Sequence, residues 1–171
     1  MNLDAINLAT EADARAVLLR CCGARRWADA MLARRPFASA DDLFRAAADI
    51  WAGLARADWL EAFAAHPRIG DIDNLRKKFA TTADWSAKEQ AGVAGAAEDV
   101  LRDLADGNLR YEERFGHIFI VCATGKTAAE MLALLRERLV NDPEAELRIA
   151  AAEQAKITRL RLEKWLLARE A

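Results

Sequence analysis

Apolar and polar residues alternate along most of the chain with the period of an α-helix, and residues typical of helix ends separate the segments. Thr10 and Ser39 each stand just before such a segment. Both are favoured as helix N-caps because the hydroxyl accepts a hydrogen bond from a free backbone N–H group. The stretch "HIFIVCATG", residues 117–125, has the composition of a β-strand but no second stretch to pair with, so it predicts no sheet.

The second half of the chain carries its own boundary residues. Gly107 and Gly116 each follow a helical segment and predict two successive helices that end there. Asp142 and Pro143 form an N-cap and first-turn pair that predicts a long last helix. Because no repeat or low-complexity linker interrupts the chain, we expect residues 1–171 to form one all-α domain, a bundle of about eight helices.

Charge and hydropathy exclude several classes of protein. The sequence has 25 Lys and Arg residues against 27 Asp and Glu residues, a net charge of -2, and the charges are scattered. We therefore expect no nucleic-acid partner and no membrane partner. The chain has no apolar run long enough to span a membrane, no apolar leader, and three cysteines without a CxxC pair. These features predict a soluble, cytoplasmic protein.

His66 is the first candidate for chemistry, in the stretch "AAHPRIGDID". Pro67 disfavours the α conformation in the residue before it, so we expect a helix to end at His66. The imidazole then either binds the last carbonyl groups of its own helix, a structural role, or stands rigid and partly exposed as a general acid or base. His117 precedes the apolar "IFIV", and we expect it in the core.

Ser86 and Glu89 raise a similar choice. The pair matches the S-x-x-E capping box, in which the carboxylate bonds back to the N-cap amide, and this interpretation is purely structural. The same geometry gathers a hydroxyl, a carboxylate, the Gln90 amide and free backbone N–H groups at one helix N-terminus, which is also an anion-binding arrangement. The pattern alone leaves both interpretations open.

Two arginines of the last predicted helix differ in their neighbours. Glu163 lies four residues after Arg159, which predicts a solvent-facing ion pair along the helix. Arg161 has Ile157 and Trp165 at the corresponding positions, so it lies along an apolar stripe. A guanidinium there needs a partner, either an internal carboxylate or the carboxylate or carbonyl groups of a ligand.

Four motifs closely resemble the 2-oxo-4-hydroxy-4-carboxy-5-ureidoimidazoline (OHCU) decarboxylases of urate breakdown; in chain order they are "HPRIG", "WSAKEQAGV", "RYEERFGHIFIVCATGK" and "ITRLRLEKWL". The similarity covers nearly the whole length. It implies an all-α homodimeric enzyme that converts the small molecule OHCU stereospecifically into (S)-allantoin, without a cofactor or a metal ion. OHCU carries its own electron sink in the ring beside the carboxylated carbon, so the reaction needs no cofactor motif.

The resemblance also implies roles for single residues. His66 corresponds to the catalytic histidine, and we expect it to act as the acid–base residue, with Glu89 close enough to share or direct the proton. Arg68 and Asp71 are given no role. The residues that the resemblance implies at the substrate are Pro67, Ser86, Glu89, Gln90, Phe119, Ile120, Val121, Cys122, Ala123 and Arg161.

Two other classes of function stay open at this stage. The domain would be a non-catalytic helical interaction module if His66 and Glu89 only capped helices, and it would then show an exposed apolar groove. It would be a hydrolase if it acted on a related ureide such as allantoin or hydroxyisourate.

Overall fold

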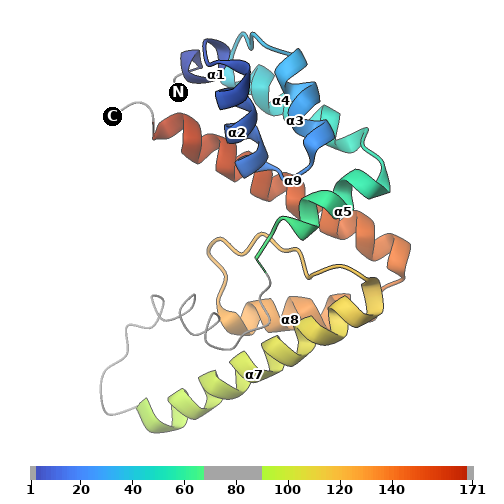
Figure 1. Ribbon diagram of the computed structural model, residues 1–171. Helices are drawn as coiled ribbons and strands as arrows, with labels where there is room; N and C mark the ends of the chain where they lie inside the picture. The colour runs from blue at the N-terminus through green and yellow to red at the C-terminus, as the bar shows by residue number, and fades with distance from the viewer. Residues whose placement is uncertain (1–2, 68–89, 169–171) are drawn as a thin grey trace. The chain divides into compact units, whose positions relative to one another are not determined.

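The structure, a computed structural model, describes residues 3–67 and 90–168, with the backbone alone for residues 90–97. The described residues form eight helices and no strand, so the all-α prediction is confirmed (Figure 1). The helices are α1 (Asp4–Asn7), α2 (Glu11–Cys21), α3 (Arg25–Ala33), α4 (Ala40–Ala52), α5 (Arg56–Ala64), α7 (Gln90–Phe115), α8 (Ala128–Arg138) and α9 (Pro143–Leu167). They fall into two compact units, a first of residues 1–66, 120–122 and 151–171 and a second of residues 67–119 and 123–150.

The helices of the first unit begin at the predicted N-caps. The hydroxyl of Thr10 accepts a hydrogen bond from the backbone N–H of Asp13 at 3.2 Å, at the start of α2. The hydroxyl of Ser39 accepts one from the backbone N–H of Asp42 at 3.1 Å, at the start of α4. These N–H groups have no acceptor inside their own helix, so each cap supplies one. Both N-cap predictions are confirmed.

Two tryptophans organise the core of the first unit, in which α2 packs on α3 and α3 packs on α4 and α5. Trp27 of α3 is fully buried and donates its indole N–H to the carbonyl oxygen of Ala47 in α4 at 3.0 Å. Trp51 of α4 donates to the carbonyl oxygen of Ala151 in α9 at 2.9 Å. Each ring fills the core while its polar atom is satisfied, and the second bond fixes the C-terminal part of α9 within this unit.

A glycine lets the ends of α2 and α5 approach each other. Gly23 follows α2, and a Cβ atom at this position would overlap the Cβ atom of Ala65. His66 comes next in the chain, and its backbone N–H bonds to the carbonyl oxygen of Phe63 at 3.1 Å. The missing side chain at Gly23 therefore allows α5 to end against the C-terminus of α2, which brings His66 there.

In the second unit, the prediction that a helix ends at Gly107 is wrong. α7 is continuous through Gly107 and packs on α8. A Cβ atom at Gly107 would lie 2.6 Å from Cδ2 of Leu135, so this glycine serves close helix packing and not helix termination. Gly116 has a φ of 72°, which glycine adopts readily, and its N–H bonds to the carbonyl oxygen of Glu112 at 2.8 Å. The predicted helix end at Gly116 is confirmed.

A buried ion pair joins the helices of the second unit. Arg138 of α8 donates to Oε1 of Glu146, in the first turn of α9, from Nε at 2.8 Å and from Nη2 at 2.5 Å. The hydroxyl of Tyr111 in α7 donates to the same oxygen, and the Asn141 amide donates to Oε2 at 2.8 Å. Because both carboxylate oxygens are satisfied, the charge of Glu146 is tolerated in a fully buried position.

The last helix begins at the predicted pair of residues. Oδ1 of Asp142 accepts hydrogen bonds from the backbone N–H groups of Glu144 at 2.9 Å and Ala145 at 3.3 Å, and Pro143 is the first helical residue. Neither α9 nor any other described helix combines the length and the apolar character needed to cross a membrane.

Candidate active site

His66 stands just beyond the end of α5, and its ring bonds to a residue of α9. Nε2 of the half-buried imidazole lies 2.6 Å from Oε1 of Gln154, whose side chain is fully buried. The amide oxygen can only accept, so Nε2 is the donor. The carbonyl groups of α5, the partners expected from the structural interpretation, do not bond to the ring within the described part of the chain.

The surroundings of His66 favour the neutral ring. Burial lowers the pKa of His66 below its ordinary value of 6.5, the hydrogen bond with Gln154 opposes this, and the positive charge of Arg161 lowers the pKa further. The ring is therefore uncharged at neutral pH. A neutral, partly exposed imidazole is able to accept a proton from a bound molecule.

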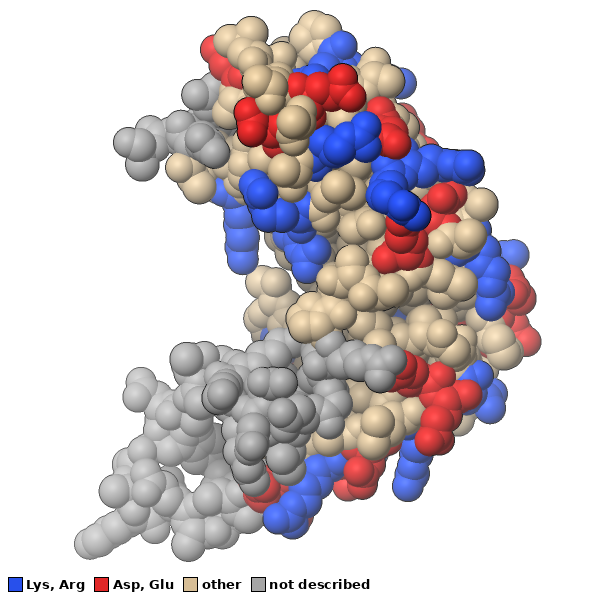
Figure 2. Space-filling view, viewed as in Figure 1, with Lys and Arg blue, Asp and Glu red and all other residues tan. Residues whose placement is uncertain are grey.

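His66 lines a cavity of about 550 Å³ between the ends of α2 and α5 and the C-terminal part of α9, all within the first unit. Three lining side chains are cations, Arg20, Arg161 and Lys164, and none of the described lining residues is acidic. The visible outer surface of the unit, in contrast, carries both signs of charge (Figure 2). A concave site with a single sign of charge suits a small anionic molecule.

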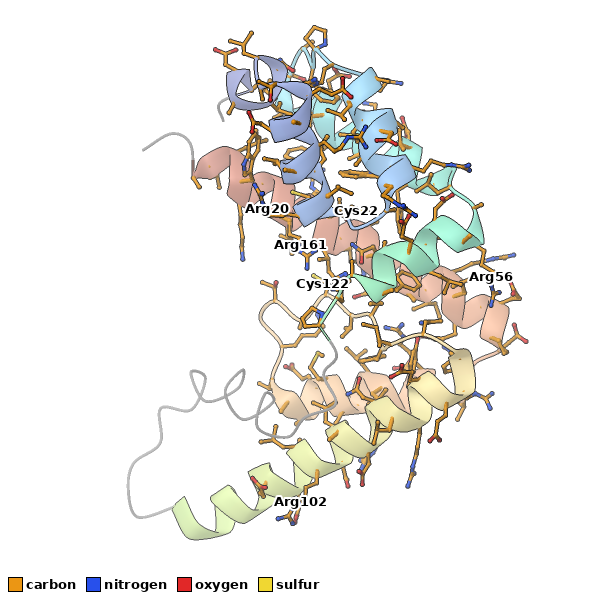
Figure 3. All side chains as sticks on the ribbon, viewed as in Figure 1. Arg20, Cys22, Arg56, Arg102, Cys122 and Arg161 are labelled. Carbon is orange, nitrogen blue, oxygen red and sulfur yellow. The ribbon has the colours of Figure 1, made fainter. Side chains whose placement is uncertain are left out.

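Arg161 reaches from α9 to the last turn of α2 (Figure 3). Its Nη1 donates to the backbone carbonyl oxygens of Arg20 and Cys21, each at 3.3 Å. A cation is favoured there because the C-terminal end of a helix carries partial negative charge. An internal carboxylate, one of the two expected partners, does not bond to Arg161 within the described residues. Its two bonds use a single nitrogen of a guanidinium that has five N–H groups, so the group retains donors for a ligand.

Arg159 occupies a different face of α9. Its Nε donates to Oε1 of Glu163 at 2.9 Å, and 58% of its side chain is exposed. Its Cζ also lies 4.4 Å from the centre of the Phe44 ring. The predicted helical ion pair is confirmed, and Arg159 does not line the cavity that holds His66 and Arg161.

The segment 119–123, whose backbone is expected at the substrate, is described in the structure. Phe119 and Ile120 are buried, while Val121, Cys122 and Ala123 are half-buried. The backbone N–H of Cys122 donates to the Glu153 carboxylate of α9 at 2.7 Å, so one donor of the segment already has a protein acceptor. Contact between this backbone and the substrate stays a prediction.

The remaining expected site residues are Ser86, Glu89, Gln90 and Pro67. Ser86 and Glu89 lie outside the described residues, and Gln90 is described only as the first residue of α7. Pro67 is exposed, directly after His66. Among the residues that were described, no group of three His, Cys, Asp or Glu side chains is placed to hold a metal ion.

Gln154 and Thr158 are two residues beside the site that the sequence did not predict. Nε2 of Gln154 donates to Oγ1 of Thr158 at 3.1 Å, and both side chains are buried. The two residues are four positions apart and Arg161 follows three positions later, so all three lie on neighbouring positions of one side of α9. Their spacing in the sequence could have indicated them. Gln154 and Thr158 stand at four-residue intervals between Ala150 and Leu162, on a buried face of the helix that is otherwise apolar at these positions.

Comparisons with known proteins cover nearly the whole chain. The sequence model of the OHCU decarboxylase family matches residues 7–163. The chain is 42% identical over 147 residues to the "Uric acid degradation bifunctional protein TTL" of Arabidopsis thaliana. This match covers 84% of this chain and 44% of that protein. It is 32% identical over 142 residues to the 2-oxo-4-hydroxy-4-carboxy-5-ureidoimidazoline decarboxylase of Amia calva. That match covers 80% of this chain and 77% of the Amia calva protein.

A solved structure is similar in fold and sequence. It is described as the crystal structure of OHCU decarboxylase in the presence of (S)-allantoin, with a TM-score of 0.71 and 37% sequence identity. The match covers 92% of this chain and 99% of that chain. The chain therefore spans nearly the full length of the solved structure but less than half of the Arabidopsis relative.

Proposed function

Because the chain belongs to the OHCU decarboxylase family, a family of carboxy-lyases, we propose that it decarboxylates OHCU to (S)-allantoin in urate degradation. The observation that carries the proposal is the pairing, in one cavity, of a neutral imidazole with three cationic side chains. The cations suit the carboxylate of the substrate, and the imidazole suits the proton transfer that accompanies its loss.

The carbon of OHCU that bears both the hydroxyl and the carboxylate loses CO₂, and the electron pair of the broken C–C bond passes into the adjoining conjugated ring system. The hydroxyl then loses its proton and becomes a carbonyl group, while the neighbouring ring carbon, which bears the ureido group, gains a proton. Overall, the carboxylate substrate takes up one proton and releases CO₂. The protein has to orient the ring and direct protons between these two carbons.

His66 is proposed to accept the proton of the hydroxyl group. Its pKa lies below 6.5 through burial, so the ring is in the basic form at neutral pH, and no acid among the described cavity residues competes for the proton. Arg161 is proposed to hold the substrate through its remaining donors, beside the two carbonyl oxygens that fix Nη1.

Further residues enter the proposal through the resemblance alone. Glu89 is proposed to assist the proton transfer, with Ser86 and Gln90 binding the substrate beside it. Pro67 and the backbone of residues 119–123 are proposed to complete the lining of the site. A homodimer is likewise proposed, and so is activity without a cofactor.

The experiment follows the ultraviolet absorbance of freshly generated OHCU with the wild type and two histidine variants. His66→Asn is expected to keep its fold and to lose about 2 or more orders of magnitude in rate. His117→Asn is the matched control, since His117 is buried and bonds to the neighbouring carbonyl of Ile118 at 3.0 Å. It is expected to lower the melting temperature and to leave the rate near that of the wild type. Near-native turnover by His66→Asn would end the assignment of His66.

A further inference from the structure

A line of buried hydrogen bonds runs behind His66, on the side away from solvent. His66 bonds to Gln154, and Gln154 bonds to Thr158. Gln154 has no exposed surface, and Thr158 is 6% exposed. Gln154 is not among the described residues that line the cavity, and His66 lies between the two.

The direction of each bond follows from the chemistry of the groups. Nε2 of Gln154 donates to Oγ1 of Thr158 at 3.1 Å, so the NH₂ group of the amide faces the hydroxyl. The Gln154 oxygen is thereby turned toward His66, where it accepts from Nε2.

We propose that Gln154, oriented by Thr158, is a positioning residue that holds the neutral His66 ring as the Nε2–H tautomer and leaves Nδ1 as its basic atom. The inference rests on the proposed function, in which His66 accepts a proton from the substrate. A neutral imidazole carries its proton on one nitrogen only, so fixing that proton on Nε2 also decides which nitrogen can act as the base. Within the described part of the chain, Nδ1 has no hydrogen-bond partner.

An amide has an advantage over a carboxylate at this position. A carboxylate would also accept from Nε2, but it would favour the charged imidazolium and raise the pKa of His66. Among the described residues, the other ionisable groups that line the cavity with His66 are Arg20 and Cys21 of α2 and Arg161 and Lys164 of α9. None of these four residues carries a carboxylate, and Gln154 sets the tautomer without adding a negative charge of its own beside the ring.

The tautomer is measurable without any activity assay, because the chain has only two histidines. In ¹⁵N NMR spectra at neutral pH, a protonated and an unprotonated ring nitrogen have well-separated chemical shifts, and His66→Asn identifies the signals of His66 by their loss. We expect the wild type to show Nε2 protonated and Nδ1 unprotonated. Gln154→Met, which keeps the size of the side chain but cannot accept the bond, is expected to show a mixture of tautomers. Its kcat should fall about tenfold or more while KM changes little.

Thr158 supplies the matched pair of variants. Thr158→Ser keeps the hydroxyl and is expected to keep the wild-type tautomer, whereas Thr158→Val removes it, lets the Gln154 amide turn over and is expected to give a mixture. These variants also decide the question if Gln154→Met fails to fold. A wild-type ring protonated on Nδ1, or an unchanged tautomer in both Gln154→Met and Thr158→Val, would overturn the inference. A wild-type enzyme that leaves OHCU untouched would overturn the proposed function instead, and the NMR result would separate the two failures.

Discussion

Nε2 of His66 and Oε1 of Gln154 lie 2.6 Å apart, although the two residues are separated by 88 positions in the sequence. Burial and the nearby charge of Arg161 both lower the pKa of the same ring, so the hydrogen bond orients an imidazole that stays neutral. This combination has consequences for the pH dependence of both rate and stability.

The acid limb of the rate profile is the first consequence. If the neutral form of His66 is the base, kcat/KM should fall with decreasing pH around a pKa below 6.5. The measurement is the initial rate on fresh OHCU between mildly acidic and neutral pH. A limb centred at or above 6.5 would show that His66 is not the titrating base or that its surroundings do not disfavour the charged ring.

Stability should change in the same direction. Between the ordinary pKa of 6.5 and the lower folded value, the unfolded chain binds a proton at His66 that the folded chain does not. The contribution of this residue to the free energy of unfolding is therefore lost as pH falls through that window. His66→Asn lacks the ionisable group, so its stability relative to the wild type should improve as the solution is acidified.

The two arginines of α9 provide a matched pair. Arg161→Lys is expected to weaken substrate binding about tenfold, or about 1.4 kcal/mol, because an ammonium group lacks the planar fork of donors that suits a carboxylate. Arg159→Lys should be nearly silent in substrate binding, since Arg159 is exposed, pairs with Glu163 of its own helix and does not line the cavity. Substrate KM measures both effects. Equal changes from the two variants would show that Arg161 has no special part in binding.

Glu89→Gln distinguishes the two interpretations of the capping-box motif. Gln is accepted at that position of a capping box, so a purely structural Glu89 should leave activity intact. If its charge directs the proton, turnover should fall by about two orders of magnitude while the melting temperature barely moves, and this is the result we expect. Ser86→Ala is the companion variant, because the loss of an N-cap costs about 1 kcal/mol of stability. A folded and fully active Glu89→Gln enzyme would leave His66 as the only candidate for proton transfer.

The ion pair of Arg138 and Glu146 should dominate the stability of the second unit. Arg138→Met removes one partner and leaves a buried carboxylate, which is expected to lower the free energy of unfolding by about 3 kcal/mol or more. Arg136→Met is the control, two positions earlier on α8. Arg136 pairs with Asp103 in an exposed position, so its loss should cost at most about 1 kcal/mol. Urea denaturation measures the free energy of unfolding of both variants. A similar decrease in Arg138→Met and Arg136→Met would contradict the prediction that the buried ion pair contributes more than the exposed one.

The sequence was sufficient where the signal is local. Thr10, Ser39 and Asp142 cap helices because each residue bonds to backbone groups within three positions of itself. The prediction for Gly107 was wrong because this glycine is needed for close packing against another helix, α8. A local sequence pattern does not reveal the contact with Leu135. It therefore cannot distinguish a glycine that ends a helix from a glycine that allows a second helix to pack closely.

The candidate site was also predictable only where the signal is local. His66 stood out because a proline follows it, and Arg161 because apolar residues flank it at helical spacing. Gln154 and Thr158 gave only a weak signal, since polar residues in a long helix are common and the role of this pair depends on the contact with His66, which follows another helix. Long-range contacts of this kind follow from the packing of helices, which spacing along one helix does not reveal.

The optical activity of the product tests the central proposal most directly. Fresh OHCU is converted with and without the enzyme, and circular dichroism follows the allantoin that forms. The account predicts rapid formation of (S)-allantoin with the wild type, because the protein delivers the proton to one face of the carbon. His66→Asn should give a slow reaction at most. Allantoin that forms at the uncatalysed rate, or without an excess of either enantiomer, would contradict the proposal.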